Sequence, residues 1–150
     1  MNNFAALKTG QWVKIKGMAE NSDFIAHKVK IRRAGQHEVI EGKLQDICLQ
    51  NRAVTVMNIS LQLDAEVAVQ GIAAQKIGLP SLRIGEIIKL KGRYCRQAGF
   101  KPEKLKLQEP EGIHYPELQG YITALDQNAK ILEVVGVRVT LRENTKIEGF

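Results

Sequence analysis

The stretch LKTGQWVKIKG, residues 7–17, decides the fold because the chain contains it a second time as LRIGEIIKLKG, residues 82–92. Five of the 11 positions are identical, and most others keep their apolar or polar character. In both copies apolar residues alternate with lysines at a period of two, which is typical of a β-strand with one buried face. The sequence therefore predicts the same strand twice.

The similarity extends beyond this strand at nearly constant spacing. KVKI at 28–31 matches KLKL at 104–107, and IEG at 40–42 matches LQG at 118–120. The spacing grows from 75 through 76 to 78, and the changes fall where turns are expected. An internal duplication explains this pattern.

Each copy is expected to be entirely β. Alternating apolar residues predict five strands in the first copy, at roughly 12–17, 25–33, 38–47, 52–57 and 59–64. Asn58 and Gly136 fall between paired short strands, where a tight hairpin requires a positive φ.

Short antiparallel strands in small units favour closed barrels, because closure removes exposed sheet edges. We expect an all-β chain of two tandem small OB-like β-barrel or sandwich units, each of about five to six antiparallel strands. The repeat places the units at 1–75 and 76–150. Alternatively, 38–110 is one complete unit, and 1–37 and 111–150 form the second.

Several of these segments resemble a known family. Residues 82–92 are similar to its strand "L-x-x-G-x-x-V-x-V-x-G", and 104–107 to its closing strand. Residues 131–140 resemble its central hairpin, and TKIEG at 145–149 its "T-x-I-x-G" ending. The family is the bacterial domain of unknown function numbered 5666. The resemblance implies an exported or lipid-anchored bacterial protein, often with several copies, and no established activity.

Residues 1–10 lack a basic segment followed by an apolar one, so they do not form a secretory signal. If a signal peptide precedes this sequence, we expect a periplasmic or cell-envelope location, and otherwise a cytoplasmic one. No apolar run approaches the length of a membrane span, so no membrane span is expected.

The net charge of +6 is unevenly distributed. Residues 7–33 hold seven basic and two acidic residues, a net +5, and residues 82–107 hold eight and two, a net +6. Alternation directs the lysines of these hairpins outward, together with Trp12, and such a face attracts polyanions. The candidate anion- or nucleic-acid-binding residues are Lys14, Lys16, Lys28, Lys30, Lys89, Lys91, Lys104, Lys106 and Trp12.

Two roles that need no external ligand also account for the same lysines. Outward lysines on edge strands block aggregation between sheets. Basic and acidic segments of one chain can also neutralise each other.

The motifs of common enzymes are absent: the sequence has no Gly-rich phosphate loop, Cys-x-x-Cys, His-Glu-x-x-His or Gly-x-Ser-x-Gly. Its three histidines do not occupy equivalent positions in the two copies. Neither Cys48 nor Cys95 has a cysteine at the equivalent position of the other copy, and the sequence leaves open whether the two are free or paired. We therefore expect no catalytic residues, no metal and no cofactor.

Two functions remain. The first is a non-enzymatic binding or structural module of the bacterial envelope, acting through a protein partner or self-association. The alternative is an OB-like protein that binds nucleic acid or another polyanion through its lysine-rich hairpin faces.

Overall fold

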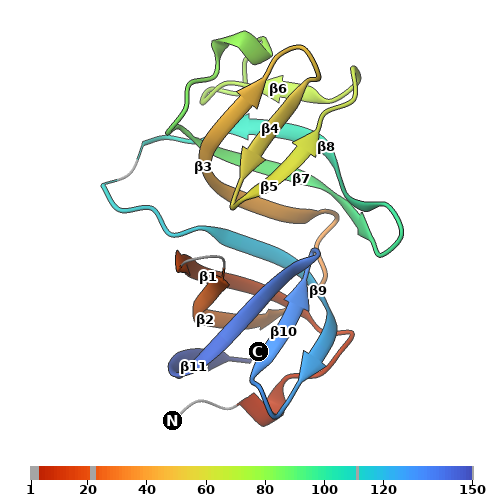
Figure 1. Ribbon diagram of the computed structural model, residues 1–150, viewed down its shortest axis with the longest axis vertical. Coiled ribbons are helices and arrows are strands. Elements are labelled where there is room, and N and C mark those ends of the chain that lie inside the picture. Colours follow the sequence, from red (N-terminus) through yellow and green to blue (C-terminus); the bar gives the residue numbers. More distant parts are fainter. Residues whose placement is uncertain (1–3, 21–22, 111, 150) are drawn as a thin grey trace.

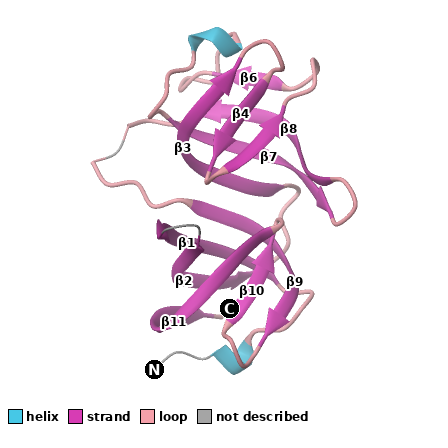
Figure 2. Ribbon diagram, in the orientation of Figure 1, coloured by secondary structure: helices cyan, strands magenta, loops and turns pink. Residues whose placement is uncertain are grey.

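The computed structural model describes residues 4–20, 23–110 and 112–149, and it is all-β, as predicted (Figures 1 and 2). Short 3₁₀ turns lie at Phe4–Ala6 and Leu79–Ser81. The strands are β1 Trp12–Glu20, β2 Asp23–Arg32, β3 Glu38–Cys48, β4 Ala53–Val56, β5 Ile59–Gln62, β6 Ala68–Gln70, β7 Ile87–Cys95, β8 Gly99–Leu107, β9 Glu117–Asp126, β10 Ile131–Val134 and β11 Val137–Glu148.

Strands from the two ends of the chain form a closed five-stranded barrel, in the lower half of Figure 1. β9, β10 and β11 form an antiparallel meander, and β1 and β2 form a hairpin. The hairpin closes the barrel, because β2 pairs parallel to β11 and β1 pairs antiparallel to β9. Apolar side chains of alternate residues fill the interior.

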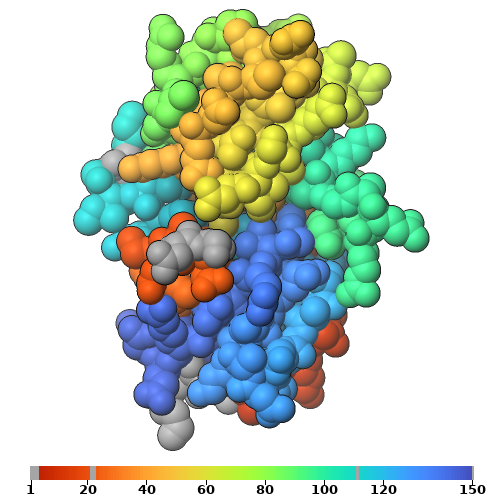
Figure 3. All heavy atoms as spheres, in the orientation of Figure 1, coloured from red at the N-terminus to blue at the C-terminus, as the bar shows by residue number. Residues whose placement is uncertain are grey.

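The additional strands lie in the upper half. β3, β4 and β5 form a second meander, and the hairpin β7–β8 joins it through β3. β6 pairs parallel to β8. Figure 3 shows the two halves in contact, with early and late residues together below and the middle of the chain above.

The predicted hairpin turns are confirmed. Met57 and Asn58 have φ of 53° and 61°, and Val135 and Gly136 have φ of 55° and 76°. Positive φ at both central residues is the condition for a two-residue turn that fits the twist of the strands.

The barrel joins strands that are distant in sequence. The N-terminal hairpin shares it with strands from residues 117–148, and β7 pairs with β3. β3 also pairs with β9, so all eleven strands belong to one hydrogen-bonded sheet. The division of the chain into two domains, at either set of boundaries, stays a prediction.

One row of register partners shows on which side of this sheet the core lies. It crosses β2, β1, β9, β3, β7 and β8 in that order, and every member is 0% exposed. The row is Val29, Ile15, Leu118, Ile40, Leu90 and Leu105. Both halves therefore bury the same face of these six strands. On each strand, the residues directly before and after the buried one point to the opposite, outer face.

Candidate polyanion-binding face

All eight candidate lysines lie on this outer face, which we call the lysine face. Two rows of register partners cross its six strands. The acidic row is Lys28, Lys16, Glu117, Glu41, Lys89 and Lys106. The neutral row is Lys30, Lys14, Gln119, Val39, Lys91 and Lys104. The β9–β3 pairing thus brings two distant lysine hairpins into one surface.

The lysines stand directly opposite one another in pairs. Lys14 faces Lys30 and Lys16 faces Lys28 across β1 and β2, and the hairpin β7–β8 repeats the arrangement. Seven of the eight are half-buried, and Lys16 is exposed. Long aliphatic stems pack on the sheet and leave the ammonium groups at its surface. Opposed like charges destabilise a sheet by about 0.2–1 kcal/mol a pair.

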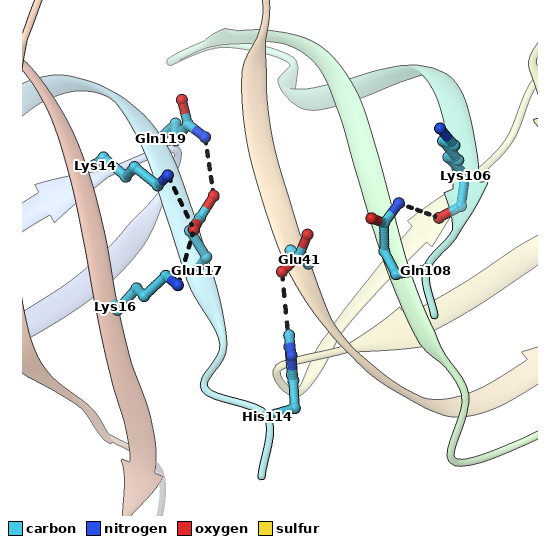
Figure 4. A network of polar contacts seen from close by, with 8 residues as sticks. All are labelled: Lys14, Lys16, Glu41, Lys106, Gln108, His114, Glu117 and Gln119. Carbon is cyan, nitrogen blue, oxygen red and sulfur yellow. Dashed lines mark hydrogen bonds and ion pairs between the residues drawn. The ribbon is translucent and has the colours of Figure 1, made fainter. Parts of the chain in front are cut away.

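Carboxylates neutralise part of the first lysine group (Figure 4). Glu117 is 4% exposed, and its Oε1 lies 3.7 Å from Lys14 Nζ and 4.0 Å from Lys16 Nζ. Gln119 Nε2 donates a 2.9 Å hydrogen bond to Glu117 Oε2. Lys28 Nζ lies 3.3 Å from an oxygen of Glu148.

The other five lysines are different: none forms an ion pair with a described residue. They are Lys30, Lys89, Lys91, Lys104 and Lys106. Repulsion from Lys28, together with partial burial, Arg32 and Lys14, lowers the pKa of Lys30 below its usual value, and the carboxylate of Glu148 offsets part of this shift. Burial lowers the pKa of Lys91, and Lys89, Lys104 and Lys106 lower it further. Repulsion between these positive charges lowers the stability of the folded state, and a bound anion would reduce that repulsion.

Two hollows open on the face. One, of about 140 Å³, is lined by Lys14, Lys16, Lys28 and Lys30. The other, of about 290 Å³, is lined by Gln36, His37, Val39, Lys89, Lys91 and Gln119. Each hollow therefore belongs to one lysine group, and Gln119 and Val39 lie between the two groups.

Trp12 lies on the same side of β1 as Lys14 and Lys16, as the alternation predicts. It lies in register with Tyr121 at the end of the face, but it is only 5% exposed. Its ring packs edge-on against Tyr121, with ring centroids 4.9 Å apart and ring planes at 89°. Gly35 lies close to the six-membered ring of the indole. Trp12 is therefore on the outer side of β1, as expected, but Tyr121 and Gly35 lie against it and leave little of its ring open to a ligand.

The exposed aromatic on this face is Tyr121, which is 44% exposed and which the sequence interpretation missed. Glu117 and Gln119, on the same side of β9, were missed too. Their alternation with Leu118, Gly120 and Ile122 predicts an outer stripe, but only the pairing of β9 with β1 and β3 places that stripe among lysines.

Other chemistry-bearing residues are dispersed. His37 Nε2 lies 3.3 Å from Glu103, and His114 Nε2 lies 3.9 Å from Glu41. Cys48 and Cys95 are free thiols. In the described part of the chain, no three His, Cys, Asp or Glu side chains are arranged to hold a metal, and no helix is long and apolar enough to cross a membrane.

The chain matches no protein-family model, no curated protein and no solved structure.

Proposed function

We propose that this protein is a non-enzymatic module that binds an extended polyanion on its lysine face. The observation that carries the proposal is the paired arrangement of eight lysines on one continuous surface, five of them without an ion pair to any described residue. Like charges directly opposite each other destabilise a sheet, and arrangements of this kind are expected at functional sites.

The two alternative roles of the lysines, protection of a sheet edge and neutralisation within the chain, explain fewer of the eight lysines than anion binding does. Protection of an edge requires an edge strand, yet β1 lies between β2 and β9, and β7 lies between β3 and β8. Ion pairs within the chain reach Lys14, Lys16 and Lys28, and the carboxylates of Glu148 and Glu41 stand opposite Lys30 and Lys89 in register. The other three lysines have no carboxylate as a register partner in the described strands: they are Lys91, Lys104 and Lys106. Attraction of an external anion accounts for the remaining lysines.

The architecture supports the finer parts of the proposal. A five-stranded barrel built from a meander and a hairpin is consistent with an OB-like unit, and such barrels commonly bind anionic polymers. Ile40 and Leu118, equivalent in the repeat, are register partners, as expected for two duplicated halves around a pseudo-twofold axis. The family resemblance and the envelope module that it implies remain predictions.

The test is the affinity for heparin and inorganic polyphosphate at low and moderate salt. We expect Lys14→Glu/Lys91→Glu to weaken binding by about tenfold or more at low salt, because phosphate-type contacts are charge-dependent. Lys8→Glu/Lys76→Glu is the matched control, since both side chains are exposed and lie off the face. Absence of binding at low salt, or equal losses in the two variants, would overturn the proposal.

A further inference from the structure

We propose that the polyanion is a single-stranded nucleic acid, whose backbone follows the neutral row and whose bases stack on Tyr121. The inference rests on the proposed function, because it identifies the ligand of the same face. It comes from two features, the position of the acidic residues on the face and the position of its exposed aromatic ring.

The acidic row is a poor path for phosphates. Glu117 and Glu41 are register partners at its centre, and two carboxylates there repel an anionic backbone. The neutral row runs beside it with Gln119 and Val39 at the same central position. Six strands about 4.8 Å apart give this row a length of about 24 Å, with two lysines at each end. A backbone therefore crosses these six strands with no carboxylate at a position of the row itself. The nearest carboxylates are Glu117, 3.7 Å from Lys14 Nζ, and Glu148, which stands opposite Lys30 on β11.

Tyr121 lies directly beside this path. It follows Gln119 by two residues on the same side of β9, a step of about 7 Å. Its ring is 44% exposed, and Trp12 holds it from the side by an edge-on contact. A ring supported in this way loses little freedom when a base stacks on it, and stacking tolerates any base.

The choice of a single strand follows from this geometry. In a duplex the base faces are covered by their neighbours, so no ring can stack on Tyr121 without unpairing. A single strand places its phosphates on the neutral row while its bases turn toward the tyrosine. The 290 Å³ hollow next to Gln119 adds polar side chains, Gln36 and His37, within the same region.

Fluorescence anisotropy of the full chain with three probes tests the inference. The probes are a labelled single-stranded oligonucleotide of about 12 nucleotides, its duplex, and polyphosphate of similar charge. We expect the wild type to prefer the single strand. Tyr121→Ala should weaken single-strand binding by about fivefold or more, and Tyr121→Phe should retain it. Neither variant should change binding of polyphosphate.

Tyr115 provides the matched control. It is 40% exposed and lies before β9 against His27, on the far side of the acidic row. Tyr115→Ala should leave all three affinities unchanged. If polyphosphate binds as tightly as the single strand, if the duplex binds better, or if Tyr121→Ala has no selective effect, this inference is wrong and the proposed function stands. If no probe binds at low salt, both fail.

Discussion

The hairpins β1–β2 and β7–β8 share their backbone and their lysines but differ in the ion pairs that these lysines form. Each has four lysines in two opposed pairs, and each has a register shift just before a glycine, Gly17 or Gly92. Glu117 and Glu148 contact lysines of the first hairpin. None of the four face lysines of the second hairpin has such a contact in the described chain.

One equivalent position accounts for most of this difference. In the repeat alignment, Glu117 on β9 corresponds to Val39 on β3. Both are 4% exposed, and both stand beside the lysines of the next strand. Three lysines of the first group therefore form ion pairs, whereas in the second group Lys89 has Glu41 opposite it in register and Lys91 has the uncharged Val39. Features that the two hairpins share are those that the fold requires, and the charge in which they differ is the property that affects binding.

The largest expected effect tests the shared part of the two hairpins. A Cβ added at Gly17 would collide with the carbonyl oxygen of Ile25, and one added at Gly92 with that of Lys101. Because both obstacles are backbone, we expect Gly17→Ala and Gly92→Ala each to lower the free energy of unfolding by about 3 kcal/mol or more. Urea denaturation followed by circular dichroism measures this.

Gly112→Ala is the control for these variants, since nothing lies within 4 Å of its added Cβ. Loss of stability in only one of the two hairpins would show that their bulges are not equivalent.

A smaller effect is expected from making the second hairpin resemble the first. Val39→Glu places a carboxylate beside Lys91 and Lys89, as Glu117 is placed beside Lys14 and Lys16. Neutralising part of the second lysine group should weaken polyphosphate binding by about fivefold to tenfold at low salt. Anisotropy with labelled polyphosphate measures the change.

Val39→Gln separates charge from shape and should bind almost as the wild type does. Glu117→Gln is the converse variant and should strengthen binding a few-fold, because it releases Lys14 and Lys16. If Val39→Glu and Val39→Gln weaken binding equally, packing rather than charge is responsible.

The smallest effect concerns pH. Burial and neighbouring lysines hold the pKa of Lys91 below its usual 10.5. Just below pH 10.5 the unfolded chain therefore binds more protons here than the folded one, so the contribution of Lys91 to stability rises with pH. Lys91→Gln should exceed the wild type in stability by less than about 1 kcal/mol near neutral pH. This advantage should shrink as the pH approaches 10.5.

Lys16→Gln is the equivalent change in the first hairpin. It removes an ion pair with Glu117 rather than a repelled charge, so no gain in stability is expected near neutral pH. Thermal unfolding across this pH range compares the two variants, and a constant advantage of Lys91→Gln would contradict the linkage.

Local pattern was enough to predict the strands and the outward lysines. Alternation along 13–16 and 28–31 depends only on neighbours two residues apart, and the turn at Asn58 depends on its own φ. The joining of β9 to β3 could not be predicted in this way, because it depends on pairing between segments 78 residues apart. For the same reason the sequence did not reveal that Tyr121 covers Trp12 or that Glu117 lies between two lysines.

The β9–β3 pairing also determines how the two lysine groups act together. Among the pairings of the described strands, it alone joins the two halves, through Val39, Ile40 and Glu41 opposite Gln119, Leu118 and Glu117. The distance between the groups is therefore set by backbone hydrogen bonds and not by a flexible linker. A polymer held by one group meets the other at a high effective concentration, with no linker entropy to lose. Avidity is thus a property of the sheet, and it should fall sharply for polymers too short to reach across it.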